Sequence, residues 1–86
     1  MSATVARRMR LRQDSRVWSL TPIHVTHEQH QGKRVWWADL SEQHELQSLR
    51  LGHATLDDVT GSPYDVTVLW VSGTNARIQG AGYGPA

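Results

Sequence analysis

The segment at residues 65–72 has the sequence DVTVLWVS and gives the strongest strand signal in the chain. β-Branched residues dominate it, and successive side chains of a strand point to opposite faces of the sheet. Apolar side chains fall on both faces: Val66, Val68 and Trp70 on one, Leu69 and Val71 on the other. This pattern is typical of a strand that is covered on both sides. We therefore predict a central strand here, with Trp70 packed in the core.

Two further strands precede this one. Residues 17–26 form a long predicted strand whose alternation changes parity at Pro22. Proline cannot donate to a sheet ladder, and a bulge shifts the parity by one residue, so we predict a bend near Thr21-Pro22. Residues 34–40 form the next strand. The polar stretch between the two predicts a hairpin around residues 27–33, with a loop longer than the two-residue type.

Trp36 and Trp37 are neighbours within the strand at residues 34–40. Adjacent side chains of a strand lie on opposite faces of the sheet, so the two rings cannot share one side. We expect one ring to fill the core and the other to lie under another element or at a contact surface. Tryptophan is enriched among the residues that dominate binding energy in protein interfaces. This pair is therefore the most informative local feature of the sequence.

The segment between these strands has a weaker pattern. Residues 41–52 fit a helix as well as a strand, and we favour a turn followed by a strand at residues 46–52. Thr55 and Asp58 stand in positions typical of a helix cap, and acidic residues suit the start of a helix. We therefore predict a short helical turn at residues 55–58.

These elements, with a short last strand at residues 76–79, predict a mainly β protein. We expect five or six short antiparallel strands in a curled sheet or small barrel, with one short helical turn between strands three and four. A small α+β fold is the alternative. We divide the chain into a basic N-terminal arm or edge strand at residues 1–16, a single β-rich domain at 17–79 and a flexible glycine-rich tail at 80–86.

The composition excludes several classes of protein. The 86 residues make one domain, and the absence of cysteine excludes disulfides, a thiolate nucleophile and a cysteine-ligated metal. No apolar run approaches the roughly 20 residues that a membrane span needs, so we predict no membrane partner. A chain without cysteine is compatible with a reducing compartment, and we expect a cytoplasmic protein.

The net charge of +1 conceals an uneven distribution. Residues 1–16 contain five arginines and one acid, whereas residues 17–86 contain four basic and seven acidic residues. Six of those acids lie between residues 39 and 65, with Arg50 as the one basic residue among them. Such asymmetry is typical of an interaction segment, although the need for solubility explains surface charge equally well.

The sequence contains no arrangement typical of an enzyme. It has no nucleophile elbow, phosphate-binding loop or paired-carboxylate signature, so we predict a non-enzymatic protein with no catalytic residues and no cofactor. His24, His27 and His30 recur at intervals of three. On a strand this spacing places successive histidines on opposite faces, and we therefore predict no metal site.

Three functions remain, and we favour a small protein-binding module, such as an inhibitor or accessory factor of a phage or other mobile element. Its predicted contact surface joins one of the paired tryptophans to nearby acids: Trp36, Trp37, Asp39, Glu42, Glu45, Asp57 and Asp58.

The alternative is a small nucleic-acid-binding barrel, because arginine pairs with phosphate through two parallel hydrogen bonds and stacks on bases. Its predicted contacts are Arg7, Arg8, Arg10 and Arg12. A third hypothesis is a virion or assembly protein, in which the basic strand and the glycine-rich tail pair with neighbouring copies of the chain.

Overall fold

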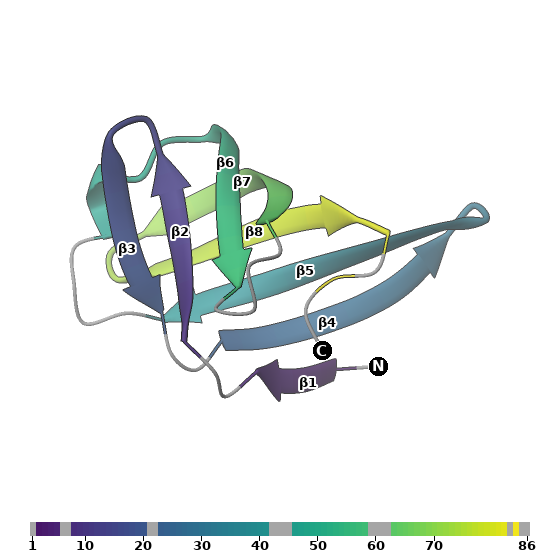
Figure 1. The fold of residues 1–86 in the computed structure, drawn as a ribbon. Coiled ribbons are helices and arrows are strands. Elements are labelled where there is room, and N and C mark those ends of the chain that lie inside the picture. Colours follow the sequence, from purple (N-terminus) through teal and green to yellow (C-terminus); the bar gives the residue numbers. More distant parts are fainter. Residues whose placement is uncertain are drawn as a thin grey trace.

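The computed structural model describes residues 2–5, 8–20, 23–41, 46–58, 63–82 and 84, and these residues form one antiparallel sheet (Figure 1). The strands are β1 (Ser2–Val5), β2 (Met9–Gln13), β3 (Arg16–Leu20), β4 (Ile23–His30), β5 (Lys33–Ser41), β6 (Gly52–Asp58), β7 (Pro63–Ser72) and β8 (Asn75–Ala81). Their order across the sheet is β1-β4-β5-β8-β7-β6-β2-β3. A single 3-10 turn, η1 (Leu46–Ser48), is the helical structure in the described part of the chain.

The first four strands are two halves of one long hairpin that bends in the middle. β1 pairs with β4, where Val5 lies opposite Ile23, and β2 pairs with β3, where Met9 lies opposite Leu20. The two registers differ by one residue, which is the offset that a β-bulge produces. The predicted bend at Thr21-Pro22 lies outside the described residues, but the chain does change from one half of the sheet to the other between β3 and β4.

This bent hairpin makes the sheet curl. The β1–β4 half of the hairpin pairs with β5 through β4, and the β2–β3 half pairs with β6 through β2. The two halves therefore join opposite ends of the block β5-β8-β7-β6. Leu20 and Ile23 are three residues apart, a span of at most about 11 Å. The two ends of the sheet must therefore meet at this corner, and Figure 1 shows β2, β3 and β6 running across β5, β7 and β8.

The core fills the inner face of the curled sheet. Alternate residues of the strands point inward, as the period of two requires. The large side chains that are completely buried include Trp36, Met9, Leu11, Leu20, Ile23, Leu40, Leu46, Leu56 and Ile78. η1 contributes Leu46 to this core and packs against β7.

The prediction of a mainly β, antiparallel, curled fold is confirmed, but the strand count is higher than the five or six expected. The helical turn predicted at residues 55–58 is wrong, because this stretch belongs to β6. Ala54 and Leu56 alternate with more exposed neighbours, and β6 lies between β7 and β2, which supply ladder partners on both sides. Sheet pairing and burial therefore outweigh the local capping pattern.

Two further local predictions are wrong. A strand does not occupy residues 46–52, since residues 46–48 form η1 and β6 begins only at Gly52. The loop between β4 and β5 is a two-residue turn, because His30 pairs with Lys33. Gln31 and Gly32 in this turn have φ values of 53° and 78°. Two positive φ values match the right-handed twist of the flanking strands, which is why short hairpins use such turns.

Described residues near both ends of the chain take part in the fold. Residues 9–13, from the segment predicted as a basic arm or edge strand, form β2 between β6 and β3. Gly80 and Ala81, from the predicted tail, belong to β8, and Gly84 lies against the Trp36 ring. Among the described residues there is no helix with the length and apolar character needed to cross a membrane.

Candidate functional site

Trp36 and Trp37 lie on opposite faces of β5, as their adjacency predicts. Trp36 is completely buried and meets Tyr64 edge to face, with ring centroids 5.8 Å apart. Glycines make room for its indole: a Cβ on Gly80 would overlap the ring, and a Cβ on Gly84 would lie 2.6 Å from it. Trp36 is therefore a core residue, and of the two only Trp37, which is half-buried, reaches the surface.

Trp37 lies on the outer face of the sheet beside a hollow of about 330 Å³. Thr26 and Glu28 of β4 and Arg77 of β8 line this hollow together with the indole. Trp37 has Thr26 directly opposite on one neighbouring strand and Gln79 on the other. The indole is thus half-buried and lines a hollow at the surface, which is the position expected of a contact residue.

Trp70 also lies on the outer face, and its prediction as a core residue is wrong. Its side chain is 41% exposed. The cause is a register shift in β7: Val68 pairs with Ile78 and Trp70 pairs with Arg77, so Leu69 is the extra residue of a bulge. A bulge reverses the face on which the following side chain lies. Trp70 therefore points away from the core that Val66 and Val68 enter.

Arg77 lies between these two tryptophans. It faces Trp70 on β7 and Asp39 on β5, and its Nε donates a 2.6 Å hydrogen bond to Asp39 Oδ1. That hydrogen bond raises the pKa of Arg77 above its ordinary value, so the guanidinium stays charged. The ion pair holds the Arg77 side chain, which lines one hollow together with Trp37 and another together with Trp70.

A larger groove opens on the Trp70 side of Arg77. Its volume is about 540 Å³, and it is lined by Ile23, His24, Asp39, Leu40, Ser41, Trp70, Asn75, Ala76 and Arg77. The apolar residues that line the groove are the exposed Trp70 and the buried Ile23, Leu40 and Ala76. Polar groups of His24, Ser41 and Asn75, all exposed, surround it. We call Trp37, Asp39, Trp70 and Arg77 the outer aromatic face.

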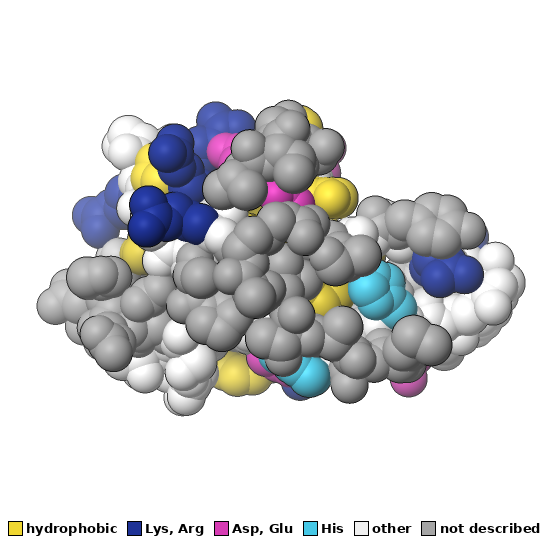
Figure 2. All heavy atoms as spheres, turned by 60° about the horizontal axis from the view of Figure 1, so that its bottom comes forward, with side chains coloured by type: hydrophobic (Ala, Val, Ile, Leu, Met, Phe, Trp, Pro, Cys, Tyr) yellow, Lys and Arg dark blue, Asp and Glu magenta, His cyan; other side chains and the backbone are white. Residues whose placement is uncertain are grey.

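A second surface gathers basic side chains at the β2–β3 end of the molecule (Figure 2). Its described members, which we call the arginine face, are Arg8, Arg10, Arg12, Arg16 and Arg50. Arg12 forms an ion pair with Asp57 on β6 through Nε, and its Nη2 donates a 3.2 Å hydrogen bond to the same carboxylate. Arg7, the remaining predicted nucleic-acid contact, lies outside the described residues.

Three arginines of this face have no acidic partner within the described part of the chain. Arg8 and Arg10 are exposed, and Arg10 shares the outer side of β2 with Arg12, as the period of two predicts. Arg16 is exposed at the start of β3. Of the three acids nearby, Asp57 is paired with Arg12, Asp14 is paired with Arg50, and Asp58 is buried. The arginine face therefore carries an excess of positive charge.

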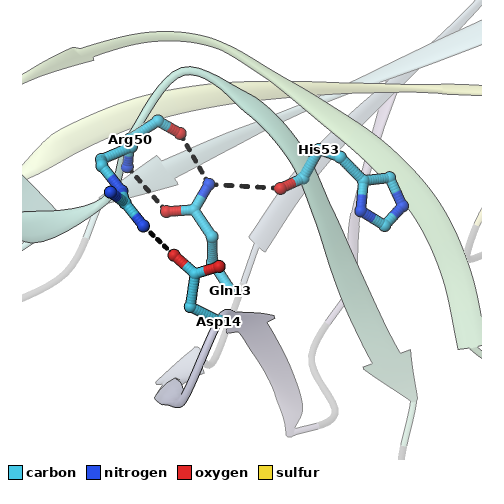
Figure 3. A network of polar contacts seen from close by, with 4 residues as sticks. All are labelled: Gln13, Asp14, Arg50 and His53. Atoms are coloured by element: carbon cyan, nitrogen blue, oxygen red, sulfur yellow. Dashed lines mark hydrogen bonds and ion pairs between the residues drawn. The ribbon is translucent and has the colours of Figure 1, made fainter.

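The side chain of Gln13 holds the backbone of Arg50 at the tip of the β2–β3 hairpin (Figure 3). Gln13 is buried, its Nε2 donates to the carbonyls of Arg50 and His53 at 2.7 and 3.3 Å, and its Oε1 accepts from the Arg50 N–H at 2.7 Å. Asp14, with φ of 55° in the turn after β2, pairs with the Arg50 guanidinium. These contacts attach the loop before β6 to the tip of the first hairpin.

The predicted acidic contacts do not form one surface. Asp39 belongs to the outer aromatic face, whereas Asp57 is paired with Arg12 at the arginine face. Asp58 is buried, with 4% of its surface exposed. Glu42 and Glu45 lie outside the described residues. The structure thus brings Trp37 and Asp39 together and separates them from the acids of β6.

The histidines follow the alternation of β4. His24 is exposed and lines the groove on the outer face, while His27 has the opposite parity and pairs with Trp36. In the regions that the structure describes, no three side chains of the metal-binding types converge. His24 is thus placed where it can donate or accept a hydrogen bond at the groove.

Sequence reasoning missed Trp70 and Arg77 as surface partners. The exposure of Trp70 cannot be seen in the sequence, because alternation gives Trp70 the same parity as the inward-facing Val66 and Val68. The bulge that reverses its direction appears only in the pairing of β7 with β8. Arg77 is a single arginine in a short strand. Its neighbour Trp70 lies across the β7–β8 hairpin, but Trp37 comes from β5, which is distant in sequence.

No protein-family model, curated protein or solved structure matches this chain. A function for it has to be inferred from the chemistry of its own surfaces.

Proposed function

We propose that this chain is a small non-enzymatic protein-binding module that contacts its partner through the outer aromatic face. The observation that carries the proposal is the exposure of Trp70 beside Arg77, which the bulge in β7 produces. Tryptophan and arginine are enriched among interface hot spots, whereas lysine and glutamate are depleted at interfaces. Inhibitors and accessory factors of phages and other mobile elements are the class of role that fits such a module.

The groove indicates what kind of partner surface fits. It offers apolar area beside Trp70, enclosed by the exposed polar side chains of His24, Ser41 and Asn75. An apolar anchor with a polar surround is the usual anatomy of a protein interface. The Asp39–Arg77 pair is already neutral as a unit, so the partner need not be strongly charged. We infer a partner loop that inserts one apolar side chain into the groove.

The test is capture of partner proteins from a lysate of the native host, with the wild-type protein and three variants as baits. Nuclease-treated lysate is passed over the wild-type protein, Trp70→Ala, Trp37→Ala and the control Leu51→Ala, and bound proteins are quantified. Leu51 is 68% exposed and lies outside the outer aromatic face, so it controls for loss of an exposed apolar side chain. A hot-spot residue contributes about 2 kcal/mol or more, which corresponds to roughly a 30-fold change in Kd.

The proposal expects a protein that is retained by the wild type and Leu51→Ala but strongly depleted with Trp70→Ala. Equal capture by all four baits would contradict it. If size-exclusion chromatography shows a concentration-dependent dimer that Trp70→Ala abolishes, the partner is a second copy of the chain.

A further inference from the structure

We propose that the arginine face is a separate binding surface for the phosphate backbone of a nucleic acid, which it contacts without reading sequence. The face is distinct from the outer aromatic face, since β6 lies between β7 and β2 in the strand order. Basic side chains gather there over one end of the molecule (Figure 2).

The spacing of the arginines suits a linear polyanion. Arg10 and Arg12 are two residues apart on one side of β2, which places their Cα atoms roughly 6.6 Å apart along the strand. Arg8 precedes them and is also exposed, and Arg16 and Arg50 extend the basic surface at the tip of the hairpin. Arg8, Arg10 and Arg12 therefore form the row. Arg16 lies opposite Gln13 and lines a hollow with Arg50 at the hairpin tip, beyond the end of the row.

The row is also charged and fixed in the way that phosphate binding needs. Arg8, Arg10 and Arg16 form no ion pair with a described residue, although Asp57, which pairs with Arg12, lies directly opposite Arg10 in the ladder. These three arginines can therefore pair with phosphate without breaking an existing ion pair. The paired residues are held in place: Arg12 by Asp57, and Arg50 by Asp14 and the Gln13 side chain. Guanidinium groups bind phosphate through two parallel hydrogen bonds, and they add little ordering cost when already fixed.

The composition of the face favours nucleic acid over an acidic protein. Protein–nucleic acid interfaces are polar and positively charged, whereas protein interfaces are anchored by buried aromatic or aliphatic side chains. The exposed large apolar side chains near these arginines are aliphatic: Val17, opposite Arg12 on β3, and Leu51, which follows Arg50 in the chain. A partner held by charge alone along a row is best matched by a phosphate backbone.

The experiment measures binding of short fluorescently labelled DNA of mixed sequence, single-stranded and duplex, over a range of NaCl concentrations. The proteins are the full-length wild type, Arg8→Ala, Arg10→Ala, the double variant and the control Lys33→Ala. Lys33 is exposed at the other hairpin turn, so its replacement removes the same charge at a distance. Point substitutions are used because truncation of the N-terminal segment would also remove β2 from the sheet.

Binding should weaken steeply with salt. In a plot of the logarithm of the binding constant against the logarithm of the salt concentration, each neutralised phosphate contributes about −0.9 to the slope for duplex DNA and about −0.7 for single-stranded DNA. Arg8→Ala and Arg10→Ala should each reduce the slope by about one unit, and the double variant by about two, for every sequence alike. Lys33→Ala should leave the slope unchanged.

Three results would overturn the proposal. The first is that neither DNA binds at low salt. The second is that Lys33→Ala reduces the salt dependence of binding as much as Arg10→Ala does. The third is that polyglutamate binds as tightly as DNA through the same arginines. The last result would assign the arginine face to an acidic protein instead.

Discussion

Trp36 and Trp37 are adjacent in the chain, but they stand in different environments because the sheet separates them. Trp36 is completely buried, and its replacement by alanine leaves a cavity that the surrounding strands cannot fill. Trp36→Ala should therefore lower the free energy of unfolding by about 3–5 kcal/mol. Trp37→Ala should lower it by roughly 1 kcal/mol or less, in the range of surface substitutions. Urea unfolding of both variants measures the difference, and equal losses would show that both rings are structural.

Gly80 and Trp36 form a close contact between β8 and β5 that leaves no room for a Cβ. Gly80→Ala should cost about 1–3 kcal/mol, because an extra carbon in a packed core forces its neighbours to move. In the Trp36→Leu background the same change should cost much less, because the smaller side chain releases the space. Thermal unfolding of the single and double variants gives the coupling energy. An additive result would mean that the penalty arises from the β8 backbone instead of the indole.

Residue-scale features differ in how far the sequence predicts them. Alternation placed Trp36 and Trp37 on opposite faces, since it depends only on β5 being a strand. It failed for Trp70, because the bulge at Leu69 depends on how β7 pairs with β8. Arg10 and Arg12 share a face through local alternation alone. Arg50 lies at the tip of the same hairpin because its backbone contacts the buried Gln13 side chain, which is 37 residues away in the chain.

At the scale of elements, the Gln13 side chain connects the tip of the β2–β3 hairpin to the loop before β6. Gln13→Ala would leave the Arg50 carbonyl and N–H in that loop, and the His53 carbonyl in β6, without this partner. Burial of unsatisfied polar groups costs about 1–3 kcal/mol, so the variant should be destabilised by that amount. Gln79→Ala, at a half-buried position on the outer side of β8, is the matched control and should have a small effect.

Differential scanning calorimetry of Gln13→Ala and Gln79→Ala compares the two glutamines directly. Gln13→Ala should also weaken DNA binding, because Arg50 would no longer be held at the arginine face. Unchanged stability with Gln13→Ala would show that the loop is held by its other contacts.

The strands that the sequence predicts best are β5 and β7, which alternate strongly. Only the first half of β4 was predicted, because residues 27–30 were assigned to the hairpin loop. β6 was predicted as a helical turn because the cap-like spacing of Thr55 and Asp58 is a local signal, whereas its strand conformation comes from pairing with β2 and β7. The tight turn at Gln31-Gly32 was predicted as a longer loop, since glutamine is not a residue that typically adopts positive φ.

At the scale of the molecule, the bent first hairpin determines the fold, because it pairs with both ends of the central block of strands. The curled, antiparallel, mainly β character was predictable from composition and alternation. The strand order was not, because it depends on pairings between segments far apart in the chain. The result is a small domain with an outer aromatic face on β5, β7 and β8 and an arginine face around β2.

The central claim is that these two faces bind different partners independently, and one crossed measurement tests it. Trp70→Ala and the Arg8→Ala/Arg10→Ala double variant are each assayed for capture of the host protein and for DNA affinity at fixed salt. Trp70→Ala should lose protein capture and keep its DNA affinity, and the arginine double variant should show the reverse. Loss of both activities in either variant, with the fold intact by circular dichroism, would contradict two separate surfaces.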